Sequence, residues 1–390
     1  MGFFVCGTAM EKRVRIGILF STSGPYAAIG RDCRDGADLA LAELAARPAD
    51  CVAFEAMRAD PQGDPRRYLD EARRMLRENG CRQIVGTITS IARKEVIPLV
   101  EKHDALLWYM CPYEGFEANE NVIYTGACPN QHLVPLFDYL LPRQGKRAYL
   151  IGANYVWGWE MNRLARDLLL EAGGEVLGER YLPLEETDVE RLIGDIEQRR
   201  PDFILNNLIG PASYAFLRAY HALGERDPTF RPEARPVVSC DLTECELGEI
   251  GPELAAGHFS TASYFDSLDT PANLAFKSRV AAAYGPGRRV SAFFEGAYNA
   301  VHMLAGAVLG TGTDEPATVK DAVHRRGFDT PHGLLRIDPR TNHADLPFHL
   351  GRITPDGAFA VVASRPAMAA DPYLTAARTP GGRANLRVVS

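Results

Sequence analysis

The feature of this sequence that most restricts its fold is an alternation of strand-like and helix-like segments, which runs along the chain twice. Residues 13–20 form a β-branched, apolar run, and residues 30–46 then carry apolar side chains at helical spacing. Asp64 and Pro65 mark a helix start, and this helix is expected to run to about Asn79. Strands and helices joined by short connections predict the α/β class, with parallel sheets covered by helices on both faces.

The same pattern restarts near Gln131, which predicts a second α/β lobe. Two further helices, expected at about 272–284 and 291–309, are more than another strand–helix unit needs, so the chain is expected to return and cover the first lobe. The expected division is two Rossmann-like lobes: 13–130 plus about 264–330, and 131–263 plus about 331–375. Residues 376–390 are rich in Pro, Gly and Arg and are expected to form a loosely held tail.

Composition excludes two classes of partner. The chain has 43 Lys and Arg against 50 Asp and Glu, a net charge of −7, whereas a surface that binds nucleic acid directly needs an excess of positive charge. No window of about 18 consecutive apolar residues occurs, so no membrane span is expected.

The compartment is predicted from the first residues and the cysteines. The start lacks the basic residues and the run of about 7–15 apolar residues that a secretory signal needs, and Met10 is an alternative natural start. The 8 cysteines have irregular spacings and no CxxC pair, as free thiols in a reducing cytoplasm would. A cytoplasmic protein is therefore expected; the alternative is a periplasmic protein whose signal peptide is missing from this sequence.

Searches for catalytic motifs return nothing: GxGxxG, GxxxxGK[ST], HExxH and GxSxG are all absent. Cys240 and Cys245, with Asp241 and Glu244 between them, lack the second Cys or His pair that a structural zinc site needs. The sequence therefore predicts no catalytic residues, no metal, no cofactor and no enzyme.

The polar and aromatic residues that follow the expected strands form a coherent set. Ligands of open α/β sheets bind beyond the carboxyl ends of the strands. The candidate ligand-binding residues at those positions are Ile88, Ser90, Tyr109, Cys111, Pro112, Tyr155, Trp157, Asn207 and Asp241. Hydroxyl, amide and aromatic groups dominate and no Lys or Arg is among them, which favours a small neutral ligand. The alternatives are that Ser90 only caps a helix, that both tyrosines are packed, and that Trp157 plugs a loop.

Several segments together resemble the type I periplasmic-binding-protein family: 18–24, 60–65, 93–98, 112–117, 129–131, 155–160, 264–265, 269–271 and 371–373. The likeness covers about residues 13–375, and the Pro-Tyr-Glu-Gly-Phe-Glu block at 112–117 is its most specific part. It looks closest to the amide-sensor branch, which contains the amide-binding negative regulator of the aliphatic amidase operon and receptors for urea and short-chain amides. The resemblance implies two lobes joined by a hinge of crossing strands, which close on a ligand in the cleft.

The resemblance also implies residue roles. By position, Ser90, Tyr109, Cys111 and Tyr155 would contact an amide, and Trp157 would close the pocket. This chain has Ile88, Cys111 and Trp157 where the amidase-operon sensor has hydroxyl or phenol groups, which predicts a larger or more aromatic ligand than acetamide.

The function expected from the resemblance is a sensor of a small neutral amide-like ligand. It would control expression of amide- and nitrile-degrading genes through a partner protein, such as an RNA-binding antiterminator, because the net charge disfavours direct binding of nucleic acid. The alternative is a solute-binding receptor that hands urea, short-chain amides or branched-chain amino acids to an ABC permease. Either protein could be a homo-oligomer.

Overall fold

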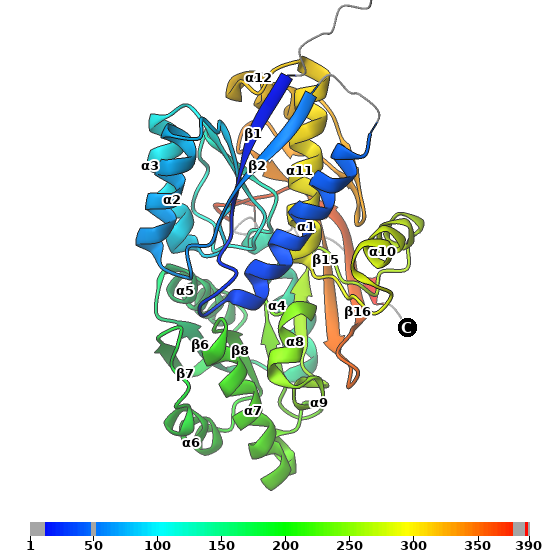
Figure 1. Ribbon diagram of the computed structural model, residues 1–390. Coiled ribbons are helices and arrows are strands. Elements are labelled where there is room, and N and C mark those ends of the chain that lie inside the picture. Colours follow the sequence, from blue (N-terminus) through cyan, green and yellow to red (C-terminus); the bar gives the residue numbers. More distant parts are fainter. Residues whose placement is uncertain (1–11, 48–51, 377–386, 389–390) are drawn as a thin grey trace, which may run out of the picture.

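The first of the two large sheets is built from the amino-terminal third of the chain and two late strands (Figure 1). The computed structural model describes residues 12–47, 52–376 and 387–388. The strands of this sheet are, in spatial order, β13 (Ile337–Asp338), β14 (His343–Ala344), β5 (Val122–Tyr124), β4 (Leu106–Tyr109), β3 (Gln83–Gly86), β1 (Lys12–Leu19) and β2 (Val52–Ala59). Neighbours from β14 to β2 pair in parallel, and β13 pairs antiparallel with β14.

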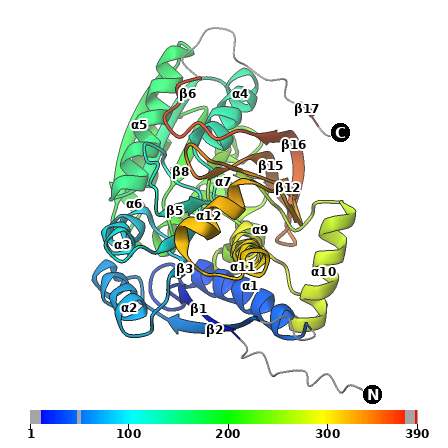
Figure 2. The same cartoon turned by 90° about the horizontal axis from the view of Figure 1, so that it is seen from above.

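Three early helices and two late helices of the chain cover the first sheet. They are α1 (Ala27–Ala45), α2 (Pro65–Arg77), α3 (Ser90–Lys102), α11 (Ala292–Thr311) and α12 (Pro316–His324). Figure 2 shows α11 end-on above α1. The two helices pack closely, because a Cβ atom added to Gly36 would lie 2.1 Å from the carbonyl oxygen of Phe294. Of the two late helices expected to cover the first lobe, the one at 291–309 corresponds to α11, which packs against α1.

The second sheet has eight strands: β17 (Arg387–Val388), β16 (Phe359–Met368), β15 (Leu346–Ile353), β10 (Phe259–Ala262), β9 (Val237–Ser239), β8 (Phe203–Asn207), β6 (Arg147–Ala153) and β7 (Glu175–Leu182). The strands from β7 to β10 pair in parallel, whereas β15, β16 and β17 pair antiparallel. Its helices are α4 (Leu133–Gln144), α5 (Val156–Glu171), α6 (Glu190–Arg199), α7 (Pro211–Arg226), α8 (Glu244–Ile250) and α9 (Pro252–Ala255). The fold class expected from the sequence, two α/β lobes with mostly parallel sheets, is confirmed.

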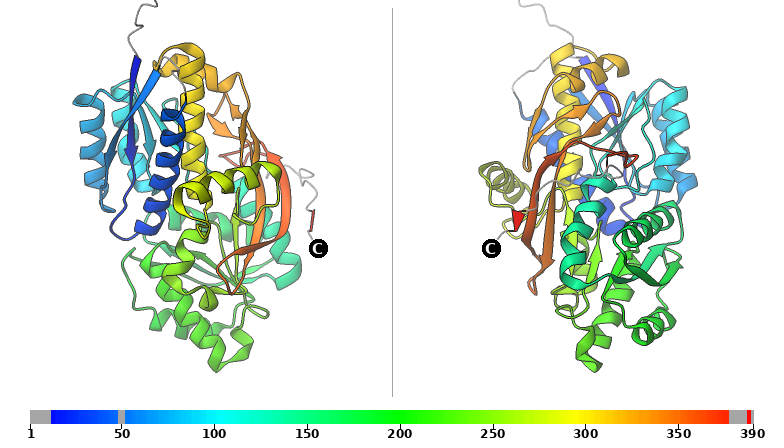
Figure 3. Two further views of the ribbon diagram at one scale, coloured as in Figure 1. Left: turned by 45° about the vertical axis from the view of Figure 1, so that its right-hand side comes forward. Right: turned by 180° about the vertical axis from the view of Figure 1, so that it is seen from behind.

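Smaller elements complete the fold. They are α10 (Pro271–Tyr284), the 3-10 turns η1 (Pro129–Gln131) and η2 (Pro228–Phe230), and the hairpin of β11 (Phe328–Thr330) and β12 (Gly333–Leu335). Figure 3 shows β15 and β16, in orange and red, along one side of the second lobe.

The chain passes between the two sheets three times, after β5, after β10 and between β14 and β15. The strands of residues 337–344 belong to the first sheet, and those of residues 346–368 belong to the second. We therefore propose that the last segment of the second lobe begins near Asp345, not near residue 331, and keep the other expected boundaries. Of the expected loose tail, 376–390, only Ala376 and β17 lie within the described residues; Cys6, Cys51 and the possible start at Met10 lie outside them.

The start of α2 follows from its local sequence, whereas the short strand β5 has no recognisable sequence signal. Asp64 accepts a hydrogen bond from the backbone N–H of Arg66 at 2.8 Å, and Pro65 is the first residue of α2, as predicted. Strand β5 was not expected from the sequence, because a strand of three residues is too short to show a periodic pattern. Within the described ranges, no helix is long and apolar enough to cross a bilayer.

Candidate functional site

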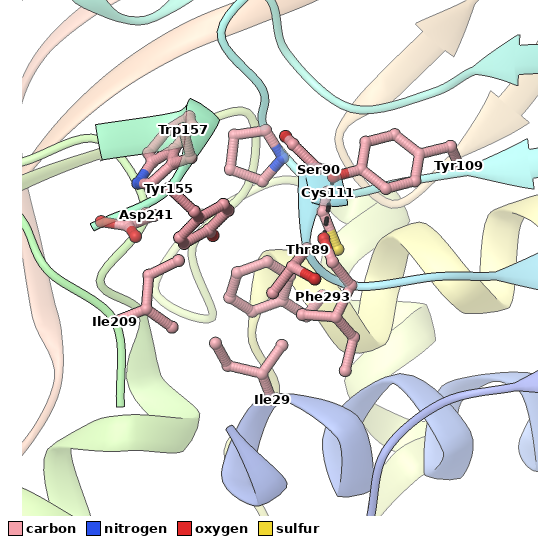
Figure 4. A pocket seen from close by; sticks show the side chains of 12 residues that line it. Ile29, Thr89, Ser90, Tyr109, Cys111, Tyr155, Trp157, Ile209, Asp241 and Phe293 are labelled. Carbon is pink, nitrogen blue, oxygen red and sulfur yellow. Dashed lines mark hydrogen bonds between the residues drawn. The ribbon is translucent and has the colours of Figure 1, made fainter. Parts of the chain in front are cut away.

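A pocket lies at the junction of the two lobes, with about 300 Å³ of empty space that is partly open to solvent (Figure 4). Side chains of both lobes line it. Those of the first lobe are Ile29, Ile88, Thr89, Ser90, Tyr109, Cys111, Pro112 and Phe293, and those of the second are Tyr155, Trp157, Ile209 and Asp241. Most of them follow the carboxyl ends of β3, β4, β6, β8 and β9, where the sequence placed the candidate site.

Eight of the nine candidate residues line this pocket, and Asn207 does not. Asn207 is the last residue of β8 and is fully buried, and its amide donates a hydrogen bond to the side chain of Asn162 on α5 at 2.9 Å. Successive side chains of a strand point to opposite faces, so Asn207 points to the face that α5 covers. In this structure Asn207 therefore lies behind the strand, outside the lining of the pocket.

Four lining residues are not among the candidates expected from the sequence: Ile29, Thr89, Ile209 and Phe293. Ile29 and Phe293 come from α1 and α11, and both are 3% exposed, so in the sequence they look like ordinary core positions. Thr89 lies three residues after the end of β3 and was identifiable as a strand-end hydroxyl. In the structure it caps α3, because its hydroxyl oxygen accepts from the N–H of Ala92 at 3.4 Å. Ser90, which was weighed as the cap, is instead the first residue of that helix.

The hydroxyl of Ser90 belongs to a buried polar network behind the pocket. Ser90 Oγ donates to Glu114 Oε2 at 2.5 Å and accepts from Arg93 Nη1 at 3.2 Å. Arg93 has no solvent exposure, and its guanidinium lies 4.5 Å from the ring centre of Tyr109. It also pairs with Glu117 at 2.7 Å. Burial alone would raise the pKa of Glu117, but the charges of Arg93 and Lys94 and their hydrogen bonds to this carboxylate together outweigh burial and lower the pKa to about 2.

Because Arg93 is paired with Glu114 and Glu117, its charge is not available to a ligand in the pocket. Lys94 pairs with Glu117 at 2.7 Å and lies 3.8 Å from Glu114, so two basic groups face two acidic groups. No Lys or Arg is among the residues that line the pocket. An isolated carboxylate ligand would therefore find no ion-pair partner on the pocket wall.

The second lobe contributes groups of a different kind. The Nε1–H of Trp157 is buried and has no hydrogen-bond partner within the described residues, and an indole nitrogen can only donate. Burial, followed by the charge of Glu246, raises the pKa of Asp241 well above its usual range. Burial also raises the pKa of Tyr155, so its hydroxyl stays protonated. The second-lobe side of the pocket therefore has two hydrogen-bond donors, the indole of Trp157 and the hydroxyl of Tyr155, and the carboxyl group of Asp241, with apolar side chains around them.

Nothing in the described ranges supports a metal centre: no group of three or more His, Cys, Asp or Glu side chains could hold an ion. Cys33, Cys81, Cys111, Cys128, Cys240 and Cys245 are free thiols.

Comparisons with known proteins give the family. The family model for the periplasmic binding protein domain matches residues 14–379. The "Leu/Ile/Val-binding protein homolog 6" of Brucella abortus (strain 2308) is 25% identical over 353 residues, which is 87% of each chain.

Two solved structures have the same fold. A solute-binding protein of an ABC transporter from Rhodopseudomonas palustris HaA2, in complex with p-hydroxybenzoic acid, has a TM-score of 0.83 and 21% identity, and covers 94% of this chain and 100% of that one. An amino acid ABC transporter substrate-binding protein from Pseudomonas fluorescens Pf-5 has a TM-score of 0.79 and 21% identity, and covers 93% and 98%.

These relatives do not confirm the amide-sensor branch that the sequence resembled. All three are named as binding proteins, which agrees with the expectation that the chain is not an enzyme. With the family model matching residues 14–379 and the two-lobed architecture in place, the chain belongs to the periplasmic binding protein family and has its type I fold.

Proposed function

We propose that this protein is the solute-binding receptor of an ABC-type transporter, located in the periplasm, and that it delivers a small organic solute to a membrane permease. The relatives named above support this proposal, since two are solute-binding proteins of ABC transporters and one is a Leu/Ile/Val-binding homologue. None of them supports the cytoplasmic amide sensor with an antiterminator partner that the sequence analysis expected. The alternative stated there, a transport receptor, fits better.

The observation that carries the proposal is that one pocket is lined by both lobes. Ser90 and Tyr109 come from the first lobe, and Tyr155 and Asp241 come from the second. A solute can touch all of them only when the lobes are together, so binding would stabilise the closed arrangement by its differential affinity for the two states. Contacts such as the ion pair of Arg31 and Glu249, 3.2 Å apart, would then form and break as the lobes close and open.

The polar groups favour a solute that carries N–H groups. Asp241 can accept such hydrogen bonds, while the unpartnered N–H of Trp157 can donate to a carbonyl oxygen. Ile29, Ile209 and Phe293 supply apolar contact. Short amides and ureas fit this description. A branched-chain amino acid is the second candidate, because its ammonium group would pair with Asp241.

A thermal-shift screen of amides, ureas, amino acids and hydroxybenzoates, followed by calorimetry, tests the proposal. A solute that binds the folded protein raises the melting temperature by mass action. At a free solute concentration of 100 times the Kd, the free energy of unfolding rises by roughly 2.7 kcal/mol. Stabilisation by at least one of these solutes, lost when the pocket is mutated, is expected. If no solute stabilises the protein, or if stabilisation survives pocket mutations, the receptor proposal fails.

A further inference from the structure

We propose that Glu114 and Arg93 are positioning residues that turn the first-lobe wall of the pocket into a surface of hydrogen-bond acceptors. A solute bound there must then present N–H donors, so carboxamides and ureas should be preferred over the matching carboxylates. This inference rests on the proposed function and narrows its solute class.

The single proton of the Ser90 hydroxyl can be donated to only one acceptor. A hydroxyl has one donor hydrogen and two acceptor lone pairs, a carboxylate only accepts and a guanidinium only donates. The hydrogen of Ser90 therefore points to Glu114 Oε2, 2.5 Å away, and one lone pair receives the hydrogen of Arg93 Nη1, 3.2 Å away. One lone pair is left for the pocket, so Ser90 can accept from a solute but cannot donate to it.

The neighbouring polar side chains of this wall are arranged in the same way. The hydroxyl of Tyr109 donates to the carbonyl oxygen of Ile88 at 2.8 Å, and the thiol of Cys111 donates to the carbonyl oxygen of Thr87 at 3.6 Å. Both protons are thus directed to protein acceptors. Thr89 is the remaining hydroxyl of the wall. Its oxygen accepts from the backbone N–H of Ala92, and its hydroxyl also forms a hydrogen bond with the side chain of Tyr26.

The network cannot easily reorient. Ser90, Arg93 and Glu114 are each at most 2% exposed, and Arg93 lies between the rings of Tyr109 and Tyr113, 4.5 and 4.6 Å from their centres. If Ser90 turned its proton to the pocket, Glu114 would lose a buried hydrogen bond, which costs more than an exposed one.

The consequence for the solute follows from the two sides of the pocket in Figure 4, where Ser90 and Cys111 lie opposite Trp157 and Tyr155. A carboxamide has N–H donors for the first-lobe acceptors and a carbonyl oxygen for the N–H of Trp157. A carboxylate of the same shape has acceptors only. One of its oxygens would face the free lone pair of the Ser90 oxygen, and no hydrogen bond could form between them. The penalty for one such mismatch in a buried site is about tenfold or more in affinity.

The first test uses the wild-type protein and calorimetry with the pairs acetamide and acetate, isobutyramide and isobutyrate, and benzamide and benzoate. Each amide that binds should bind at least about tenfold more tightly than its acid. If an acid binds as tightly as its amide or more tightly, the protein is still a receptor but the inference is overturned. If neither these compounds nor ureas nor amino acids bind, both proposals fail.

The second test separates positioning from charge. Glu114→Gln lets the side-chain amide donate to Ser90, which frees the hydroxyl proton, so the amide-to-acid preference should fall about tenfold. Glu117→Gln removes the same charge from the same cluster without touching Ser90, and it should change the preference less than about threefold. Equal effects of the two variants would overturn the positioning role.

If Glu114→Gln does not fold, Ser90→Ala takes its place. This variant removes the acceptor and leaves Arg93 paired with Glu114. It should weaken amide binding about tenfold and leave acid binding unchanged or stronger. Weaker binding of both compounds by the same factor would overturn the inference.

Discussion

The backbone of Pro25 in the first lobe lies directly against Gly210 in the second: a Cβ atom added to Gly210 would come within 2.1 Å of the carbonyl oxygen of Pro25. No residue with a side chain fits there while the lobes are together. The lobe contact is therefore made by backbone atoms, next to the pocket wall that contains Ile209.

Gly210→Ala should therefore weaken solute binding without changing the pocket. The added methyl group prevents the closest approach of the lobes, and apparent affinity falls in proportion to the fraction of closed protein. We expect at least a tenfold loss of affinity by calorimetry and a larger radius of gyration in solution with solute present.

Gly173→Ala is the control for this variant. Both glycines have positive φ angles, 63° at Gly210 and 71° at Gly173, but nothing lies within 4 Å of a Cβ atom at Gly173. Gly210 has a ψ angle of −140°, a backbone region that only glycine readily adopts, so Gly210→Ala should cost more stability than Gly173→Ala, and the comparison of affinities is made at a temperature at which both variants are folded. Equal affinities of the two variants would show that the Pro25 contact does not limit closure.

Asp241→Asn should distinguish an amide from an amino acid as the natural solute. A neutral amide keeps a hydrogen bond to the Asn oxygen and should lose less than about tenfold in affinity. An ammonium group would draw the proton off Asp241 when it binds and form an ion pair, so the loss of that pair in the variant should weaken its binding about 100-fold or more. Calorimetry with both classes measures this difference. Asp269→Asn, which changes an exposed acid outside the pocket, should leave both affinities unchanged.

Strand topology explains why most of the residues that the sequence selected line one pocket. Ser90, Tyr109 and Tyr155 follow parallel strands, and the carboxyl ends of such strands meet at one edge of a sheet. Ile29 and Phe293 could not be predicted in this way, because they reach the pocket only through the tertiary packing of α1 against α11.

The direction of Asn207 was also beyond the sequence. It depends on the register of β8, a strand of five residues, in which a shift by one residue exchanges the two faces. In the same way, the donor and acceptor roles of Ser90 depend on Glu114, which is 24 positions away in the chain and whose contact only the fold creates.

Tyr155→Phe should weaken solute binding by about 1 kcal/mol, roughly fivefold, because it removes one hydroxyl at the pocket and keeps the ring. Tyr149→Phe is the matched control in the same lobe, since the hydroxyl of Tyr149 donates to Asp195 at 2.5 Å and does not line the pocket. The control should lower the melting temperature and leave affinity unchanged. An unaltered Kd for Tyr155→Phe would remove its hydroxyl from the proposed solute contacts.

Two buried carboxyl groups on α8 should make stability fall as the pH rises. Burial raises the pKa of Glu244 to about 8, against the hydrogen bond from the N–H of Asp266 at 2.9 Å, and burial also raises the pKa of Glu246 to about 8. An unfolded Glu titrates near about 4.3. Between these two pKa values the folded state binds more protons than the unfolded state. The stability that these protonated carboxyl groups contribute is therefore fully present below the unfolded pKa, and it is lost as the pH rises through about 8.

Glu244→Gln should flatten this pH dependence. Oε2 of Glu244 is buried without a partner in the described part of the chain, so a neutral amide removes the group that must lose its proton at high pH while Oε1 can still accept from Asp266. Denaturant unfolding at pH 5 and pH 8.5 should show a smaller loss of stability for the variant than for the wild type. Glu253→Gln, an exposed change on the adjacent α9, should keep the wild-type slope. Parallel curves for Glu244→Gln and the wild type would mean that Glu244 does not change its protonation between these pH values, and that the pH dependence of stability has another origin.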